Sequence, residues 1–143
     1  MQLRTEVEID APPREVWRVL SDFRSYPEWN PFITQISGQL LAGERLAVTL
    51  GSSEGRQWNF KPTLIVVEPE RELRWLGHLW IKGLFDGEHF FSLREVDGKT
   101  RVVHGEDFRG ILVKFMGGSL TDAARGFVGM NQALKRRVEQ HAA

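Results

Sequence analysis

The chain has 143 residues, of which 41% are hydrophobic and 10% aromatic, and it contains no cysteine. This composition is typical of one compact domain without disulfides, and it excludes thiolate nucleophiles and cysteine-ligated metal sites. The 19 Lys and Arg residues balance 19 Asp and Glu residues. Because the chain has no net positive charge to hold a phosphate backbone, we expect no nucleic-acid partner.

Neither the start of the chain nor any apolar run indicates a secretory or membrane segment. Residues 1–6 already include the acidic Glu6, whereas a signal peptide needs a basic region followed by an apolar one. No apolar run approaches the ~20 residues that a membrane-spanning helix requires. We therefore expect a single cytoplasmic domain over residues 1–143, with no transmembrane segment.

The first elements in chain order are a strand and a short helix. Residues 2–9 alternate between polar and apolar side chains, as in a half-buried strand. After Pro13, apolar residues recur at helical spacing from Val16 to Phe23, which predicts an amphipathic helix of about ten residues. The two prolines within residues 26–31 are expected to end any helix there.

The remainder predicts successive strands and then a long helix. Residues 32–109 are broken by short turns, which indicates an antiparallel meander. A helix over 119–139, with a capping box from Ser119 to Asp122, would be about 31 Å long. A strand over 57–68 would be about 40 Å long, against a radius of gyration of about 14 to 15 Å for a domain of this size. The sheet is therefore expected to curve around the helix.

Several short blocks of the sequence resemble one known family. They are Ile9-Asp10-Ala11-Pro12-Pro13-Arg14-Glu15-Val16-Trp17, Tyr26-Pro27-Glu28-Trp29-Asn30-Pro31-Phe32, Glu72-Leu73-Arg74-Trp75, Gly83-Leu84-Phe85-Asp86-Gly87-Glu88-His89 and Phe108-Arg109-Gly110-Ile111-Leu112. With the order of elements, they resemble the polyketide cyclase/dehydrase and lipid-transport group of the START-like and Bet v 1-like superfamily, over essentially the whole chain. The resemblance implies an α+β helix-grip fold, in which a curved antiparallel sheet wraps around a long C-terminal helix and one or two short helices follow the first strand. It also implies a hydrophobic small-molecule ligand, on which some members of the superfamily catalyse reactions.

The dipeptide Asp97-Gly98 predicts a two-residue hairpin turn, which fixes the pairing of the last two strands. In that register Phe91 faces His104, and His89 faces Glu106, all on one face of the sheet. A slip by one residue would place a poorer set of side chains on the apolar face.

His89 and Glu106 are the candidate catalytic residues if the protein is an enzyme. A carboxylate raises the pKa of a neighbouring imidazole and burial raises that of the carboxyl, so the pair could exchange a proton near neutral pH. The alternative is a mutually satisfied structural pair, or two side chains at the solvated end of the sheet. His104 is expected to be a core histidine with a hydrogen-bond partner.

The other histidines offer no site. His78 is expected to point outward, and His141 lies in a C-terminal segment that is expected to fray. The four histidines have no spacing typical of metal ligands. We therefore expect no metal and no cofactor.

The inward-facing aromatic residues are predicted to line a largely apolar cavity between the sheet and the C-terminal helix. The predicted ligand-contacting residues are Trp58, Phe60, Trp75, Leu79, Phe91, His104, Phe108, Phe127 and Met130. Gly126 and Gly129 each cost roughly 1 kcal/mol within a helix, so either another backbone packs against them or they leave room for a ligand. The alternative to a cavity is an ordinary filled core.

The apolar segment 111–116 is a candidate gate to the cavity, a candidate homodimer or membrane-surface contact, or a segment packed against the short helix. Tyr26, Trp29 and Phe32 mark either an entrance or a structural corner.

Three functions remain open at this stage. The first is binding of a small, mostly hydrophobic ligand that is lipid-like, ketide-like or aromatic. The second is a cyclase or dehydratase that uses His89 and Glu106, and the third is a protein-interaction module of the same fold.

Overall fold

The computed structural model describes residues 1–51, 55–78, 83, 86–110, 113 and 117–142. Its elements, in chain order, are β1 (Gln2–Ile9), α1 (Pro13–Leu20), the 3-10 turn η1 (Phe23–Ser25), α2 (Tyr26–Trp29), β2 (Ile33–Ser37), β3 (Ala47–Gly51), β4 (Gln57–Phe60), β5 (Thr63–Glu68), β6 (Glu72–His78), β7 (Asp86–Val96), β8 (Lys99–Arg109) and α3 (Gly117–Ala142). None of the helices in this part of the chain is long and apolar enough to cross a membrane.

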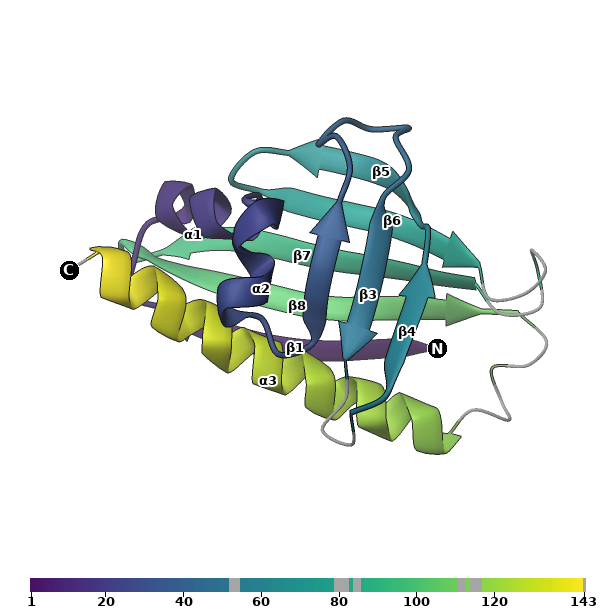
Figure 1. Cartoon of the computed structure of the whole chain (residues 1–143). Coiled ribbons are helices and arrows are strands. Elements are labelled where there is room, and N and C mark those ends of the chain that lie inside the picture. The colour runs from purple at the N-terminus through teal and green to yellow at the C-terminus, as the bar shows by residue number, and fades with distance from the viewer. Residues whose placement is uncertain (52–54, 79–82, 84–85, 111–112, 114–116, 143) are drawn as a thin grey trace.

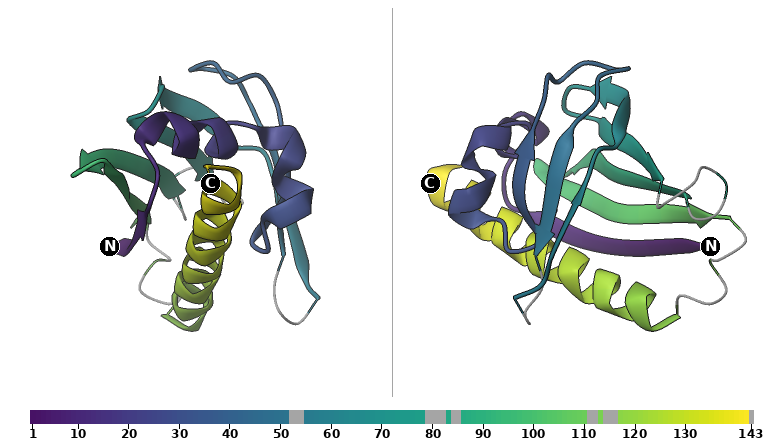
Figure 2. Two further views of the ribbon diagram at one scale, coloured as in Figure 1. Left: turned by 90° about the vertical axis from the view of Figure 1, so that its left-hand side faces the viewer. Right: turned by 45° about the vertical axis from the view of Figure 1, so that its right-hand side comes forward.

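The strands form two antiparallel sheets that flank the long helix. One sheet has five strands in the order β1-β8-β7-β6-β5, and the other has three in the order β2-β3-β4. Helix α3 lies between the two sheets, and α1 and α2 lie near its C-terminal end (Figures 1 and 2). The predicted helix-grip architecture, with a curved antiparallel sheet around a long helix, is confirmed.

The predicted long strand over 57–68 is divided into β4 and β5, which belong to different sheets. The break falls at residues 61 and 62. Pro62 has no N–H to donate to a neighbouring strand, although its carbonyl accepts from the Leu46 N–H at 2.8 Å. The chain therefore changes sheet at the proline instead of bending as one strand.

The helices also differ from the sequence-based prediction in their bounds. Residues 26–29 form α2 although prolines were expected to end any helix there, because Pro27 lies in the first turn, where a missing N–H costs nothing. Helix α1 ends at Leu20, before the predicted Phe23. Helix α3 begins at Gly117, two residues before the predicted start. The predicted capping box depends on Ser119, whose side chain lies outside the described ones.

The predicted register of the last hairpin is confirmed. Phe91 pairs with His104, and His89 pairs with Glu106. Asp97 and Gly98 have φ angles of 53° and 81°, as a primed two-residue turn requires. The two rows of side chains on β7 and β8 therefore face the predicted sides of the sheet.

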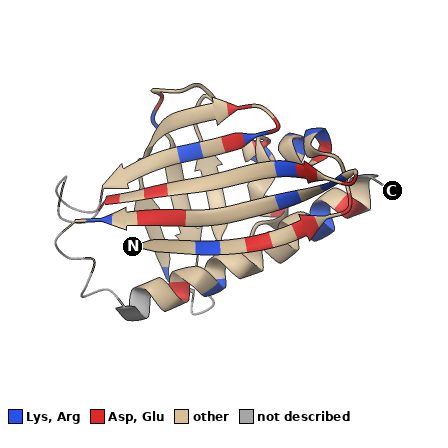
Figure 3. Ribbon diagram, turned by 180° about the vertical axis from the view of Figure 1, so that it is seen from behind, with Lys and Arg blue, Asp and Glu red and all other residues tan. Residues whose placement is uncertain are grey.

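Acidic and basic residues lie along the strands of the five-stranded sheet (Figure 3). The register places Glu88 directly opposite Asp107, on the outer face of the sheet, because His89 and Glu106, one position along, lie on the inner face. Arg74 lies between them, with its Nη1 3.3 Å from the Glu88 carboxylate and 3.5 Å from that of Asp107. Its guanidinium also stacks over the Phe90 ring at 4.6 Å. The arginine offsets the repulsion that two facing carboxylates would produce.

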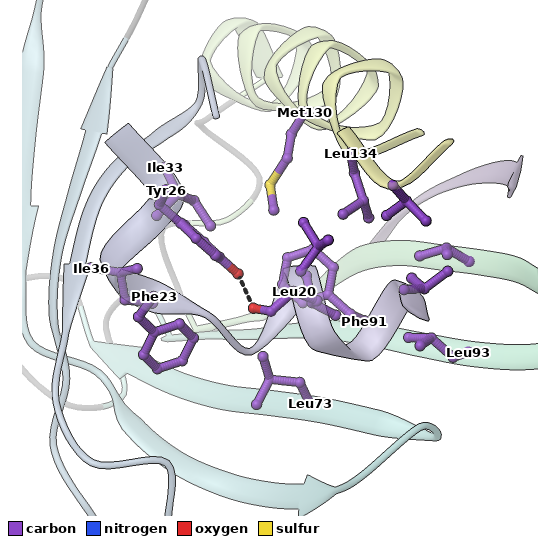
Figure 4. Close-up of a cluster of buried hydrophobic side chains, with 14 of the residues drawn as sticks. Leu20, Phe23, Tyr26, Ile33, Ile36, Leu73, Phe91, Leu93, Met130 and Leu134 are labelled. Carbon is purple, nitrogen blue, oxygen red and sulfur yellow. Dashed lines mark hydrogen bonds between the residues drawn. The ribbon is translucent and has the colours of Figure 1, made fainter. Parts of the chain in front are cut away.

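A hydrophobic core joins the short helices, both sheets and α3 (Figure 4). Tyr26 is fully buried in it, and the Tyr26 hydroxyl donates a hydrogen bond to the Leu20 carbonyl. The Tyr26 ring makes edge contacts with Phe23 and Trp29. Tyr26 was predicted to mark either an entrance to the cavity or a structural corner, and its burial favours the structural corner.

Candidate functional site

Five polar side chains form a continuous hydrogen-bonded series between the five-stranded sheet and α3. Glu106 Oε1 lies 2.7 Å from His89 Nδ1, and His89 Nε2 lies 2.7 Å from His104 Nε2. His104 Nδ1 lies 2.8 Å from Asn131 Oδ1. Asn131 Nδ2 then donates to Thr5 Oγ1 at 2.8 Å. We call these five residues the buried network.

Three strands and one helix position the buried network. His89 on β7 faces Glu106 on β8, and Thr5 on β1 faces His104 from the other side of β8. Period-2 alternation along each strand directs these side chains to the inner face of the sheet. Asn131 reaches them from α3, which packs across that face.

Aromatic rings enclose the two histidines. Trp75 stacks on His89 with 5.0 Å between ring centroids and 6° between ring planes. His104 is sandwiched between Phe91 at 4.3 Å and Phe127 at 4.4 Å. His89 is 5% exposed and His104 is fully buried. The histidines therefore lie in a medium of low polarity, where a charged imidazole is unfavourable.

Burial shifts the pKa values of the buried network so that its uncharged forms are favoured. Desolvation lowers the pKa of His89 to about 3. The pKa of His104 is also well below its usual value, first because of burial and then because His89 is close. Burial, with a smaller contribution from the Asp107 charge, raises the pKa of Glu106 to about 8. At neutral pH the arrangement is a neutral carboxylic acid beside two neutral imidazoles.

Glu106 is a partly exposed end of the buried network. Its side chain is 20% exposed, against 6% for the His89 side chain that it contacts. Glu106 lies three residues before the end of β8, next to Gly87 on β7. A Cβ added at Gly87 would collide with Glu106 Oε2. The glycine therefore leaves the space that the carboxyl group occupies.

Most of the predicted ligand-contacting residues lie inside, one is exposed, and one falls outside the described residues. Buried residues from the predicted set are Trp75, Phe91, His104, Phe108, Phe127 and Met130, and Phe60 packs against the core while partly buried. Trp58 is 56% exposed on β4, an edge strand of the three-stranded sheet, so its placement in the interior was wrong. Leu79 lies outside the described residues, as does the segment 111–116 apart from Val113.

The side chains predicted to wall a cavity contact one another instead. Phe127 makes ring contacts with His89, His104 and Phe32, and Met130 is fully buried in the core. A pocket of about 60 Å³ does occur, but it lies between the short helices and the C-terminal part of α3, where its lining includes Arg18, Trp29 and Arg137. The described interior around the buried network therefore has the character of a filled core.

The two glycines within α3 have different surroundings. A Cβ at Gly126 would collide with the Phe32 ring, so the close neighbour is a side chain and not the expected backbone. A Cβ at Gly129 would meet no atom within 4 Å.

Sequence reasoning missed Asn131 and Thr5. Asn131 is a polar residue within the apolar stripe of α3, four positions after Phe127, and it is 2% exposed. Thr5 stands on the apolar side of β1 between Leu3 and Val7. A lone polar residue on each inward-facing stripe is the signal that could have identified them.

The other two histidines lie outside the buried network, as expected. His78 lies near the surface and its Nδ1 is 2.7 Å from Asp86 Oδ1. His141 is exposed in the last turn of α3. Within the described residues, no group of three or more His, Asp or Glu side chains is placed to bind a metal ion.

Comparison with protein families identifies the fold group. Residues 1–142 match the model of the family described as polyketide cyclase / dehydrase and lipid transport. The chain belongs to this family. No curated protein matches the sequence.

Solved structures of family-like proteins share the fold at low sequence identity. The Zhui aromatase/cyclase from a Streptomyces species has a TM-score of 0.76 and 16% identity, and the match covers 100% of this chain and 96% of that one. A START superfamily protein from Mycobacterium smegmatis has a TM-score of 0.67 and 22% identity, with 97% of each chain covered. Ara h 8.0201 has a TM-score of 0.69 and 15% identity, with 98% of each chain covered. These likenesses establish the START and Bet v 1 type of fold, which by itself does not assign roles to residues.

Proposed function

We propose that this family member binds a small, mostly hydrophobic molecule at the Glu106 end of the interior, with an uncharged oxygen of the ligand accepting the hydrogen bond of the Glu106 O–H in place of His89 Nδ1. The observation that carries the proposal is a neutral carboxylic acid at a partly exposed end of the buried network, next to the enclosed histidines. An apolar site with a few placed polar groups is the usual composition of a small-molecule site.

The aromatic side chains next to the buried network would supply the apolar contacts. Trp75, Phe91 and Phe127 already pack against the histidines. Because these rings fill the described interior, the ligand has to displace Phe127 or Met130, or bind beside Glu106 at the end of the sheet. Membership of the polyketide cyclase / dehydrase and lipid transport family supports a hydrophobic ligand in general terms.

Native mass spectrometry tests the binding proposal first. Protein purified without denaturant is compared with the same sample after organic extraction. A reproducible bound species of a few hundred daltons is the expected result. Protein that carries no bound species and does not bind added hydrophobic compounds would instead favour a protein-interaction module of the same fold.

Matched substitutions at Glu106 test the contact itself. The probe is acetonaphthone, an uncharged aromatic ketone, and binding is followed by the NMR signals of the His89 ring. Glu106→Leu removes the donor and should weaken binding about tenfold, as expected for one lost hydrogen bond to a ligand. Glu106→Gln keeps an N–H donor of similar size and should bind within a few-fold of the unsubstituted protein. Equal affinities for both variants would remove Glu106 from the site.

A second candidate function is general acid catalysis of a dehydration or cyclisation. It is favoured by the raised pKa of Glu106 together with the adjacent imidazole, since a catalytic acid works best with a pKa near the operating pH. Glu106 would donate its proton to the departing hydroxyl of a ketide-like substrate, which leaves as water, and the resulting carboxylate would take the proton from the adjacent carbon as the carbon–carbon double bond forms. Glu106→Gln and His89→Ala should each abolish turnover and leave binding in place. Full activity in both variants would eliminate this function.

A further inference from the structure

We propose that Asn131, held by Thr5, is a positioning residue that sets the direction of every hydrogen bond in the buried network and so makes Glu106 its donor end. The inference deepens the proposed function, since it rests on the same site and explains why Glu106 carries the proton that a ligand oxygen would accept in place of His89 Nδ1. It follows from five hydrogen-bond distances: one joins the Thr5 hydroxyl to a backbone carbonyl, and four join side chains of the buried network.

Thr5 fixes the orientation of the Asn131 amide. The His104 carbonyl oxygen can only accept, and Thr5 Oγ1 lies 2.7 Å from it, so the Thr5 hydroxyl donates its single proton there. Toward Asn131, at 2.8 Å, the Thr5 oxygen can then only accept. The facing Asn131 atom must be the donor Nδ2, which directs Oδ1 toward His104.

Both imidazoles continue the direction of hydrogen bonding that Asn131 sets. Asn131 Oδ1 accepts from His104 Nδ1 at 2.8 Å, so the proton of a neutral His104 is on Nδ1 and its Nε2 is an acceptor. His89 Nε2 must therefore donate across the 2.7 Å contact between the two rings. A neutral His89 then presents a lone pair on Nδ1 to Glu106.

The direction of hydrogen bonding determines the protonation state of the Glu106 carboxyl group. A carboxylate facing the His89 Nδ1 lone pair at 2.7 Å would be repelled, so Glu106 Oε1 carries a proton and donates it. The alternative with the same number of protons is a Glu106 carboxylate beside a His89 imidazolium. The aromatic walls and the 5% exposure of His89 disfavour that ion pair, because both charges would be desolvated.

Reversing the network requires the Asn131 amide to turn over. With Nδ2 toward His104, the proton of His104 moves to Nε2 and that of His89 to Nδ1, so Glu106 Oε1 becomes an acceptor, which is the role of a carboxylate. Counting only Glu106 and the two imidazole rings, the reversed network with a carboxylate holds two protons, and the forward network holds three. Ionisation of Glu106 is therefore coupled to the loss of the contact between Asn131 and Thr5.

Charged groups near Glu106 include the Asp107 carboxylate and the Met1 ammonium, which donates to the Phe108 carbonyl at 3.1 Å. His89 is its neighbour on β7, and Asp107 follows it on β8 with its side chain on the outer face near Arg74. Leu3, which faces Glu106 from β1, carries no charge. The strand partners of Glu106 therefore bring no cation that would stabilise a carboxylate apart from His89 itself.

A matched pair of substitutions at Thr5 tests the proposal. Thr5→Val removes the hydroxyl and frees the amide to adopt either orientation, whereas Thr5→Ser keeps the hydroxyl. The first readout is the tautomer of each histidine, measured by the 15N shifts of the ring nitrogens. The second is the pKa of Glu106, measured by carboxyl 13C NMR. Both are recorded without a ligand.

In the unsubstituted protein and in Thr5→Ser we expect His104 protonated on Nδ1 and His89 protonated on Nε2. In Thr5→Val we expect mixed tautomers and a pKa of Glu106 lower by about one, a tenfold change that corresponds to one net hydrogen bond. Unchanged tautomers and an unchanged pKa in Thr5→Val would overturn the proposal. So would His104 protonated on Nε2, or a doubly protonated His89, in the unsubstituted protein.

These readouts separate the inference from the proposed function. A protein with the expected tautomers that binds no hydrophobic molecule would refute the ligand and leave the role of Asn131 intact. A protein that binds acetonaphthone with reversed tautomers would refute the role of Asn131 alone. If Thr5→Val does not fold, the tautomers of the unsubstituted protein still decide the question.

Discussion

His89 Nε2 and His104 Nε2 lie 2.7 Å apart in the interior, so one ring must donate to the other and the two cannot both carry a proton on these atoms. This contact links the partly exposed carboxyl group of Glu106 to the fully buried amide of Asn131. A change at either end of the buried network is therefore expected to alter the other.

The first prediction concerns the pH dependence of stability. The pKa of Glu106 is raised from 4.5 to about 8, so the folded state keeps a proton that the unfolded state loses, and the free energy of unfolding falls as pH rises through this range. The pKa of His89 is lowered from 6.5 to about 3, so the unfolded state binds the proton first, and stability also falls as pH drops below 6.5. For Glu106 and His89 the two opposite slopes cancel between pH 4.5 and 6.5, so stability is greatest in that range, and the lowered pKa of His104 moves the maximum toward its upper end.

Urea unfolding of Glu106→Gln at several pH values checks the prediction. Glutamine can still donate to His89 but does not titrate, so the alkaline decline, at most about 1.4 kcal/mol per pH unit for one proton, should disappear. Glu6→Gln, at an exposed position on the outer face, is the control and should retain it. The same decline in both variants would show that Glu106 titrates normally.

The second prediction compares the two glycines within α3. Gly129→Ala should raise the free energy of unfolding by about 0.5 to 1 kcal/mol, because an added Cβ meets no neighbour and alanine is the better helix former. Gly126→Ala gains the same helix propensity but pushes against the Phe32 ring, which also contacts Phe127. It should therefore destabilise. Urea titrations measure both, and equal gains in the two variants would contradict the packing seen at Phe32.

The third prediction concerns Arg74 on the outer face. Arg74→Met keeps the aliphatic stem and removes the charge between Glu88 and Asp107, and it should lower the free energy of unfolding by about 1 kcal/mol. Glu88→Gln in the same background should recover part of that loss, because it removes one of the two facing charges. A double-mutant cycle measures the coupling. Additive effects would mean that the guanidinium is not coupled to Glu88 and contributes through Glu72, Asp107 and its stacking on Phe90.

The pairing of the site could be predicted from sequence because one turn determines it. Asp97-Gly98 fixes the register, and period-2 alternation then places His89 opposite Glu106 on the inner face. The long helix and the curvature followed from periodicity and length. The division at Pro62 was missed because an apolar alternating run continues across it, and only its missing N–H marks the change of sheet.

The rest of the site depends on how α3 is rotated against the sheet. His104 and Asn131 are 27 residues apart, and their contact requires a tertiary arrangement that local patterns do not encode. Whether the aromatic residues wall a cavity or fill a core was equally undetermined, since both use the same residue types. Trp58 was misplaced for the related reason that β4 and β5 were treated as one strand.

The final prediction uses Gly87 to move the Glu106 carboxyl group without changing any residue of the buried network. In Gly87→Ala the new methyl group collides with Glu106 Oε2, which is the far end of a flexible side chain and can turn toward solvent. The hydrogen bond to His89 Nδ1 should then be lost, and the pKa of Glu106 should fall from about 8 toward its ordinary value of 4.5. Carboxyl 13C NMR measures that pKa, and Gly98→Ala, at the exposed hairpin turn, is a control for general loss of stability. A pKa that stays near 8 in Gly87→Ala would mean that the space beside this glycine does not determine where the carboxyl group lies.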